Sequence, residues 1–317
     1  MAEVAGRVAD GFEARIREHE EQWLSPLAVH SYETRGRLRE EAACSVRTPF
    51  QRDRDRLLHS KPFRRLKGKT QVFIDPEGDH YRTRMTHTLE TTAIARGVAR
   101  ALRLNEDLTE AVGLGHDTGH TPFGHAGEET LDACVRETWG RRFRHNEQSL
   151  RIAETLNLTA EVRDGILCHT GPQEPRTLEG KIVRLVDRVA YINHDIDDAI
   201  RHGILGPGDL PADEIRLLGS TGSTRIDTLA HDLIENSAAA GDIVQGEEIG
   251  AAMLSLRAFM FERVYLGEHV RPEHERARAT VRAIFERLLA RGDEPDAIVD
   301  FISGMTDRYA LTYAASL

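Results

Sequence analysis

The 317-residue sequence is poor in cysteine, in aromatic side chains and in long apolar runs. Its three cysteines, Cys44, Cys134 and Cys168, are far apart and have no CxxC spacing. We therefore expect reduced thiols in a cytoplasmic protein, not a disulfide framework or a cysteine zinc site. No run of about 18 apolar residues occurs, which argues against a membrane span. The N-terminal residues 1–23 also lack the apolar segment of a signal peptide.

The charge of the chain is unevenly distributed. The formal net charge is -10, which argues against a protein that coats DNA nonspecifically. The segment Arg47–Gln71, however, contains nine basic and two acidic residues. This basic island has two interpretations. It lines a phosphate route or a nucleotide site between subunits, or it is a solvated face on which alternating arginines and aspartates pair.

Helical periodicity dominates the sequence, and the one β-like apolar run is residues 71–74. We therefore predict an all-α fold. The expected organisation is an N-terminal arm (1–44), a helical core (45–205) and a C-terminal helical region packed on the core (206–317). Helices are predicted over 85–104, 108–117, 145–156, 161–169, 178–200, 225–237, 247–265, 271–291 and 295–314.

Four ligand-type side chains fall on three of these predicted helices: His87, His116, Asp117 and Asp187. Two imidazoles and two carboxylates suit Mn²⁺, Fe²⁺, Zn²⁺ or Mg²⁺, with positions left for water and substrate. Asp187 lies on an apolar stripe, where a carboxylate is costly unless it is paired or bound to a metal. Taken singly, each residue could be a packed histidine or an ion pair with a neighbouring arginine. Together they predict a divalent metal site.

The order H…HD…D of these four residues resembles the signature of the HD-domain metal phosphohydrolases. Longer segments, at 47–72, 80–90, 145–151 and 303–309, are similar to the deoxynucleoside triphosphate triphosphohydrolases, the dGTPase-like group. The similarity runs from about Arg47 to the C-terminus, and residues 220–246 carry no recognised motif. The resemblance implies an HD-domain helical core with additional C-terminal helices. It also implies cleavage of a dNTP, with dGTP as one candidate, into a deoxynucleoside and inorganic triphosphate.

Candidate proton-transfer residues lie just after the His116-Asp117 pair. Attack of water on the α-phosphorus expels the 5′-oxygen, a poor leaving group that needs a proton. Glu128 is one helical turn beyond His125, and a histidine–carboxylate couple can hold an imidazole in one tautomer. The resemblance makes His125 the acid or base and Glu128 its orienting partner, with the direction of proton transfer open. His120 either takes part as well or packs behind the metal ligands.

The resemblance also implies contacts to the phosphates. A triphosphate carries about four negative charges near neutral pH, which Arg and Lys side chains neutralise. Arg84 is expected near the α-phosphate, and His145 is expected to contact a phosphate. Arg188 and Tyr191, which follow Asp187 on the same predicted helix, are expected to hold the outer phosphates.

Two further residues match positions that bind the 3′-hydroxyl group in relatives, namely Gln71 and Asp195. A bulky side chain under the sugar rejects a 2′-hydroxyl, whereas a hydrogen-bonding group does not. Tyr191 is the candidate for that contact as well.

The resemblance extends to partners. Homo-oligomers, often hexamers, are typical of the family, and some relatives are activated by a second nucleotide or by single-stranded DNA. Two other functions compete with the dNTP triphosphohydrolase. One is an HD phosphohydrolase for a deoxynucleoside monophosphate, a cyclic nucleotide or an alarmone. The other is a non-catalytic nucleotide or single-strand sensor, although every predicted metal and proton-transfer position is occupied by a suitable residue.

Overall fold

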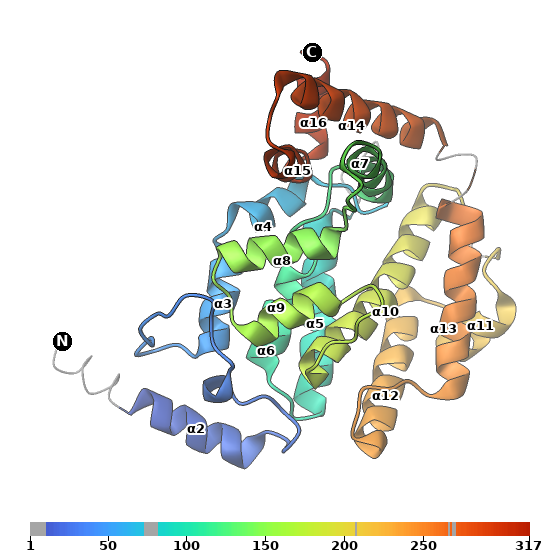
Figure 1. The fold of residues 1–317 in the computed structure, drawn as a ribbon. Coiled ribbons are helices and arrows are strands. Elements are labelled where there is room, and N and C mark those ends of the chain that lie inside the picture. Colours follow the sequence, from blue (N-terminus) through green and yellow to red (C-terminus); the bar gives the residue numbers. More distant parts are fainter. Residues whose placement is uncertain (1–10, 73–81, 207, 266, 268–270) are drawn as a thin grey trace, which may run out of the picture.

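The computed structural model describes residues 11–72, 82–206, 208–265, 267 and 271–317. Across these ranges the ordered elements are helices, apart from an isolated antiparallel bridge between Thr70 and Thr83. The all-α prediction is confirmed (Figure 1). The β-like run at 71–74 lies partly outside the described residues. No helix in the described part is both long and apolar enough to cross a membrane.

The part of the chain up to Arg201 forms the helices α2 to α10, which include those that carry the candidate site. Their bounds are α2 (Phe12–Trp23), α3 (Pro49–Leu58), α4 (Lys61–Arg65), α5 (Arg84–Ala101), α6 (Glu106–Gly115), α7 (Gly124–Trp139), α8 (His145–Thr155), α9 (Ala160–Cys168) and α10 (Leu178–Arg201). Two short 3-10 turns, Ser31–Glu33 and Leu66–Gly68, accompany them.

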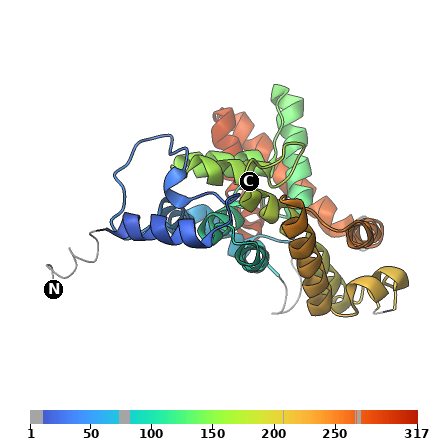
Figure 2. The ribbon, with the colours of Figure 1, turned by 90° about the horizontal axis from the view of Figure 1, so that it is seen from below.

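The C-terminal part continues with helices. They are α11 (Ala212–Leu218), α12 (Gly222–Ala240), α13 (Glu247–Met260), α14 (Arg271–Arg291), α15 (Pro295–Ser303) and α16 (Asp307–Ala314), with a π-helical turn, η3, over Phe261–Tyr265. Seen from below, α2 and the loop after it lie on one flank of the molecule, and α11 and α13 lie on the opposite side (Figure 2).

Side-chain caps fix the starts of the three helices that carry the predicted metal ligands. Thr83 caps α5, Asn105 caps α6 and Thr177 caps α10, each by accepting a hydrogen bond from a backbone N–H in the first turn. Such caps satisfy N–H groups that have no partner inside the helix. They therefore set the register in which His87, His116 and Asp187 emerge.

Three apolar clusters hold the helices together. The first joins α3, α5, α6, α9 and α10 through residues such as Leu57, Val98 and Ile166. The second packs α7 against α14–α16, and the third packs α10 against α11–α13. Leu233 of α12 also belongs to the first cluster. The region 206–317 thus shares all three clusters with helices of the segment 45–205, so the clusters span the predicted boundary.

The predicted arm, 1–44, is anchored on the core in its described part. The backbone N–H of Val29 donates to Glu179 of α10 at 3.0 Å. Arg37 forms a buried ion pair with Asp53 of α3. These contacts hold the loop after α2 against the helices that form the first cluster.

The predicted helices differ from the structure in which helices exist and in the continuity of one helix. Helices α2, α3, α4 and α11 were not predicted. Helix α7, which starts immediately after the His116–Phe123 stretch, was not predicted, because Gly and Pro in that stretch indicate a turn. The predicted helix 295–314 is wrong in its continuity. The chain breaks after Ser303, and Thr306 caps a new helix by accepting a hydrogen bond from the N–H of Tyr309.

Candidate metal centre and active site

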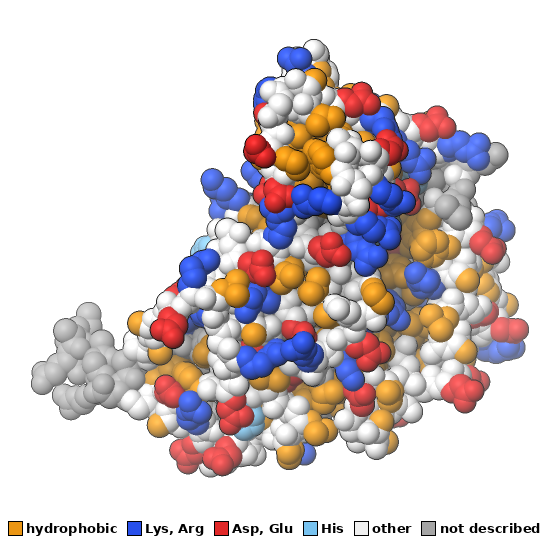
Figure 3. Space-filling model, in the orientation of Figure 1, with side chains coloured by type: hydrophobic (Ala, Val, Ile, Leu, Met, Phe, Trp, Pro, Cys, Tyr) orange, Lys and Arg blue, Asp and Glu red, His pale blue; other side chains and the backbone are white. Residues whose placement is uncertain are grey.

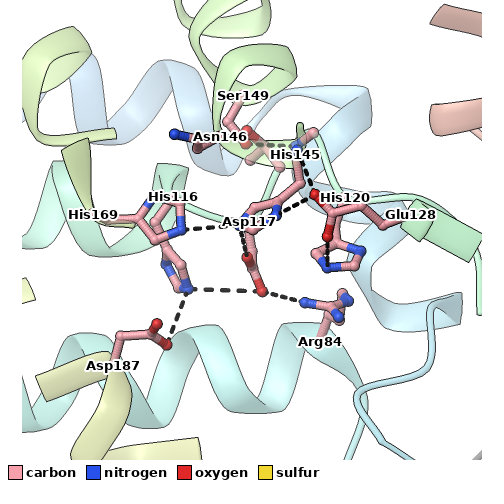
Figure 4. A network of polar contacts seen from close by, with 12 residues as sticks. Arg84, His116, Asp117, His120, Glu128, His145, Asn146, Ser149, His169 and Asp187 are labelled. Carbon is pink, nitrogen blue, oxygen red and sulfur yellow. Dashed lines mark hydrogen bonds and ion pairs between the residues drawn. The ribbon is translucent and has the colours of Figure 1, made fainter. Parts of the chain in front are cut away.

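The four predicted metal ligands come together from three helices. His87 lies in the first turn of α5, His116 and Asp117 follow the last turn of α6, and Asp187 lies in the middle of α10. The Nε2 atom of His116 is 3.7 Å from a carboxylate oxygen of each aspartate. His87 Nε2 is 3.0 Å from Asp187 Oδ1. Figure 4 shows His116 between Asp187 and Asp117.

The hydrogen bonds of His116 prepare it as a ligand. Its Nδ1 donates to the carbonyl of Gly113 at 2.7 Å, which fixes the tautomer and leaves Nε2 with a free lone pair. That buried Nε2 has no hydrogen-bond partner among the residues that the structure describes. An orphaned imidazole nitrogen between two carboxylates fits a divalent cation.

The charges of this group are strongly coupled. Burial alone would raise the pKa of Asp117, but the guanidinium of Arg84, 2.6 Å away, holds it well below the ordinary value. Burial likewise opposes ionisation of Asp187, but the neighbouring His87 and His116 lower its pKa to about 2. Burial lowers the pKa of His87, and its hydrogen bond to Asp187 reverses this and raises the pKa. Both carboxylates are therefore ionised near neutral pH, as a metal site requires.

A cluster of histidines around Glu128 adjoins this centre. Glu128 accepts hydrogen bonds from the backbone N–H and from Nδ1 of His145, each at 2.8 Å. His120 Nε2 is 3.5 Å and His125 Nδ1 is 3.9 Å from the other Glu128 oxygen. Despite its burial, the pKa of Glu128 is held well below its ordinary value, foremost by His145.

The predicted proton-transfer residues differ in accessibility. His120 is buried and stacks on His145, with ring centroids 4.7 Å apart. Burial and the charge of Arg84 hold its pKa well below the ordinary value. The side chain of His125, in contrast, is 76% exposed. Of these histidines, His125 is thus the one that an incoming molecule reaches directly.

The loop between α6 and α7 needs small residues to carry these groups. A Cβ atom at Gly119 would lie 2.3 Å from the backbone nitrogen of Ser149 in α8. Phe123 has a left-handed backbone, φ 61°, and its N–H donates to Asp307 at 2.9 Å. The loop therefore lies close to both α8 and α16. Its position sets the start of α7, so that Glu128 in the second turn of this helix faces His145.

Two buried histidines near the centre were missed by sequence reasoning. His169, at the end of α9, has its Nε2 3.2 Å from Nε2 of His145. His194 of α10 lies 3.3 Å from Glu90 and packs edge-on against His87. His169 comes immediately after the end of its helix, as His116 does. This shared position is the sequence feature that could have indicated His169 as a site residue. His194 follows Asp187 by two helical turns.

Two of the residues predicted to bind substrate lie directly beside the predicted metal ligand Asp117. Arg84 contacts Asp117, and His145 Nε2 is 3.9 Å from Asp117 Oδ1. Arg188 has no ion pair in the described part of the chain, although it directly follows Asp187. The hydroxyl of Tyr191 accepts a hydrogen bond from Arg257 of α13. Arg257 was not predicted, because it lies 66 residues further along the chain.

The two residues expected at a sugar hydroxyl have free acceptor atoms. Gln71 Oε1 and Asp195 Oδ1 are both buried without a hydrogen-bond partner among the described residues. The other Asp195 oxygen accepts a hydrogen bond from Tyr265, another residue that the sequence did not indicate. Burial raises the pKa of Asp195 to about 7.

Comparison with known proteins agrees with this geometry. The HD domain family matches residues 84–192, and the phosphohydrolase-associated domain family matches 243–316. A deoxyguanosinetriphosphate triphosphohydrolase-like protein of Caldanaerobacter subterraneus is 52% identical, over 93% of this chain and 92% of the relative. Proteins with the same description from Clostridium perfringens and Desulfatibacillum aliphaticivorans are 44% and 41% identical, and each match covers at least 93% of both chains.

The chain belongs to the family of deoxyguanosinetriphosphate triphosphohydrolase-like HD-domain proteins. It is therefore a metal-dependent phosphohydrolase by family, and its His/Asp cluster can hold a metal. A solved structure of a hypothetical protein from Aquifex aeolicus has a similar fold, with a TM-score of 0.52 over 82% of this chain and 67% of that chain. At 22% identity this likeness concerns the fold alone.

In this family member the phosphohydrolase-associated region reaches the HD-domain loop through the partly buried Asp307 and the buried Lys69. Asp307 of α16 accepts hydrogen bonds from the N–H of Thr70, at 2.9 Å, and from the N–H of Phe123. Lys69 donates to the carbonyls of His120 and Ser303. The recognised 303–309 motif thus holds both the start of α7 and the residue before Gln71.

The structure divides the basic segment Arg47–Gln71 into two parts. The arginines of α3 and Arg47 are ion-paired, for example Arg47 with Asp55 at 3.0 Å and Arg52 with Glu41 at 2.9 Å. Lys61, Arg64, Arg65 and Lys67 form no ion pair with a described residue. The first part therefore fits the salt-bridged interpretation, and the second part leaves its positive charge unneutralised. Figure 3 shows basic side chains gathered where α14–α16 meet the rest of this face.

Proposed function

We propose that this protein hydrolyses dNTPs, dGTP among them, to a deoxynucleoside and inorganic triphosphate. The observation that carries the proposal is the position of Asp117. One of its oxygens faces His116 and Arg84, and the other faces His145, which Glu128 holds. A metal centre and a proton-transfer cluster therefore meet at one carboxylate. The name of the family's relatives supplies the substrate class.

His87, His116, Asp117 and Asp187 would hold the divalent ion. When bound, such an ion neutralises phosphate charge and lowers the pKa of a water molecule beside it. The ligand set accepts Mn²⁺, Fe²⁺, Zn²⁺ or Mg²⁺. Arg84 supports the site because its guanidinium keeps Asp117 ionised and adds positive charge beside it.

His125 is the proposed proton donor to the leaving 5′-oxygen. The new bond joins the oxygen of water to the α-phosphorus, the bond from phosphorus to the 5′-oxygen breaks, and the 5′-oxygen takes the proton of His125. The attacking water releases one proton to bulk solvent, and His125 takes a proton back from solvent before the next turnover. Glu128 lies 3.9 Å from Nδ1 of His125, near enough to orient its ring. The exposure of His125 suits this role, since the donor has to meet a substrate that enters from solvent.

The phosphates would be held by cations and hydroxyls that are already close to the metal ligands. Arg84 and His145 lie on the two sides of Asp117, which suits contact with the α-phosphate region. Arg188 has a charge that no described carboxylate neutralises, and with Tyr191 and Arg257 it would hold the outer phosphates. Charge-assisted contacts of this kind are the strong ones in phosphate recognition.

The sugar would meet Gln71, Asp195 and Tyr191. The unpartnered acceptors Gln71 Oε1 and Asp195 Oδ1 support contacts with a donor hydroxyl, as the 3′-hydroxyl is. A free buried acceptor is costly, and a ligand hydroxyl would remove that cost. The Tyr191 ring is the proposed barrier to a 2′-hydroxyl.

Product analysis tests the proposal. Metal-free protein is loaded with Mn²⁺ or Mg²⁺ and incubated with each of the four dNTPs, and products are separated by anion-exchange chromatography. We expect deoxynucleoside and triphosphate, and we expect His116→Ala to abolish both. Pyrophosphate or phosphate as the product would instead favour an HD phosphohydrolase of another specificity. The absence of turnover with every dNTP would favour a non-catalytic sensor.

The assembly and the effectors of the protein are proposed by family resemblance. Homo-oligomers, as hexamers, would be detected by light scattering after size-exclusion chromatography. The unneutralised half of the basic segment, Lys61 to Lys67, supports binding of an activating nucleotide or of single-stranded DNA. Activation would be measured as an increase in turnover of one dNTP on addition of a second dNTP or of an oligonucleotide.

A further inference from the structure

The proton-transfer cluster contains side chains that can themselves hold a metal ion. His120, His125 and Glu128 each offer one ligand atom, and these three atoms lie within 4.8 Å of one another. None of the three residues is among the four ligands of the predicted metal centre. We propose that His120, His125 and Glu128 bind a Zn²⁺ ion that inhibits the protein, in addition to the ion of the metal centre.

Glu128 supplies the central oxygen atom of this site. Its Oε1 accepts two hydrogen bonds from His145, each at 2.8 Å. Its Oε2 lies 3.5 Å from Nε2 of His120 and 3.9 Å from Nδ1 of His125. Burial alone would raise the pKa of Glu128, but the neighbouring histidines hold it well below its ordinary value. Oε2 is thus a charged oxygen that faces two imidazole nitrogens at distances longer than an ordinary hydrogen bond.

His120 directs a lone pair at this oxygen. Its Nδ1 lies 3.4 Å from the carbonyl of Thr121, which can only accept, so the proton of the neutral ring is on Nδ1. Burial and the charge of Arg84 hold the pKa of His120 well below its ordinary value, which agrees with a neutral ring. Nε2 therefore faces Glu128 without a proton (Figure 4). A lone pair and a carboxylate oxygen repel each other, and a cation between them would bind both.

The distances and the ligand types favour zinc. Ligand nitrogens and oxygens about 2.0–2.2 Å from a tetrahedral Zn²⁺ ion lie about 3.4 Å apart. The 3.5 Å between His120 and Glu128 agrees with this value. His125 has to come closer by about half an ångström. Its side chain is 76% exposed and can turn to do so. Two imidazoles with one glutamate form a zinc ligand set that leaves a position for water, whereas Mg²⁺ prefers oxygen ligands.

Zinc at this position would stop proton transfer by His125. A ring with zinc on Nδ1 keeps one proton, on Nε2, and loss of that proton would leave an imidazolate anion. Such a ring is too weak an acid to protonate the leaving 5′-oxygen near neutral pH. The inhibition rests on the proposed function, in which His125 is the proton donor. Zinc binding does not, because zinc content is measured without substrate.

Zinc content tests the site. Wild-type protein, His125→Leu and His125→Cys are stripped of metal, dialysed against one free concentration of Zn²⁺ at about pH 8 and analysed by mass spectrometry of the metal. We expect His125→Leu to bind one Zn²⁺ fewer per chain than wild type. His125→Cys should restore that ion, because a thiolate is a zinc ligand. The matched control is His231→Leu, at another exposed helical histidine, which should bind as much zinc as wild type.

A spectroscopic measurement identifies residue 125 as the ligand. Co²⁺ replaces Zn²⁺ in wild type and in His125→Cys, and the absorption spectra are compared. We expect His125→Cys to gain a thiolate-to-cobalt charge-transfer band in the near ultraviolet that wild type lacks. This band also decides if His125→Leu does not fold, as judged by circular dichroism.

Inhibition is measured on the Mn²⁺-loaded wild type. Zn²⁺ at the concentration that fills the site should lower kcat for a dNTP at least about 10-fold while Mn²⁺ stays bound. His231→Leu should be inhibited to the same extent.

The possible failures are distinguishable. Equal zinc content in wild type and His125→Leu, or the absence of the cobalt band, would overturn the site. Full activity with zinc bound would overturn the inhibition. Inhibition with release of Mn²⁺ would overturn it as well, because zinc would then act at the metal centre. Zinc that binds through residue 125 in a protein without dNTP turnover would sustain the site and contradict the proposed function alone.

Discussion

The carboxylate of Glu128 accepts two hydrogen bonds from His145, one from the backbone N–H and one from Nδ1, each 2.8 Å long. The same carboxylate lies 3.9 Å from His125. Because one acid lies beside two imidazoles, Glu128→Gln should leave both rings without a carboxylate neighbour. We expect kcat to fall about 100-fold. The matched control is Glu129→Gln, at an exposed neighbour that pairs with Arg278. Equal activity of the two variants would contradict this role of Glu128.

Removal of the proposed proton donor should affect the chemical step and leave the fold intact. The His125 side chain is largely exposed, so His125→Gln should not alter the melting temperature. We expect kcat to fall by about 100-fold or more with a small change in KM. His231→Gln, at another exposed helical histidine, serves as the control. Wild-type kcat in His125→Gln would move the proton-transfer role to another group.

Asp187 should contribute to the affinity for the metal ion, in addition to any contribution to folding. Asp187→Asn removes the charge that lies 3.0 Å from His87 and 3.7 Å from His116. We expect the affinity for Mn²⁺ to fall by at least about 100-fold in a calorimetric titration. Asp197→Asn, on the same helix, should leave the affinity unchanged. A variant at Asp187 that binds Mn²⁺ as the wild type does would exclude this residue as a ligand.

Asp307 should stabilise the catalytic loop from a distance. Its partly buried carboxylate accepts hydrogen bonds from Thr70 and from Phe123, and an asparagine can satisfy only part of them. We expect Asp307→Asn to lower the free energy of unfolding by about 2 kcal/mol and to reduce kcat. The exposed Asp296, which is ion-paired with Arg141, gives the control Asp296→Asn, with a loss of at most about 1 kcal/mol. If urea denaturation shows equal stability for the two variants, Asp307 does not stabilise the catalytic loop in this way.

The raised pKa of Asp195 predicts a dependence of stability on pH. Burial raises it from 3.8 to about 7. Between these values the folded protein keeps a proton that the unfolded chain releases, so this residue's contribution to stability is lost as pH rises through about 7. We expect Asp195→Asn to gain up to about 4 kcal/mol relative to wild type between pH 4 and pH 8.

Urea denaturation of the metal-free proteins measures this difference. The exposed Asp213 supplies the control Asp213→Asn, which should change by the same amount as wild type at both pH values. A stability difference between Asp195→Asn and wild type that does not vary with pH would show that Asp195 is ionised in the folded protein throughout this range.

Much of the helical core was predictable because its helices are amphipathic and capped. The pattern around His87, His116, Asp117 and Asp187 indicated three helices, and the structure brings those side chains within a few ångströms of one another. Helix α7 escaped prediction because its first residue follows Phe123 in a left-handed conformation. That backbone is held by Asp307, which is 184 residues away.

Three of the missed site residues, Arg257, Tyr265 and Lys69, have roles that depend on long-range contacts. Arg257 and Tyr265 meet Tyr191 and Asp195 across 66 and 70 residues. Lys69 looks like part of a solvated basic segment, yet it is buried between two backbone carbonyls. His169 differs, because its position after a helix end repeats that of His116, and this repetition is visible once the helix ends are known.

If water attacks the α-phosphorus of a dNTP, the oxygen of that water ends in the triphosphate, and isotope labelling measures where it goes. The metal-loaded protein is allowed to hydrolyse dGTP in ¹⁸O-labelled water, and the products are analysed by mass spectrometry. The account predicts triphosphate that carries one ¹⁸O atom and unlabelled deoxyguanosine. Labelled deoxyguanosine, or labelled phosphate or pyrophosphate in place of triphosphate, would contradict it.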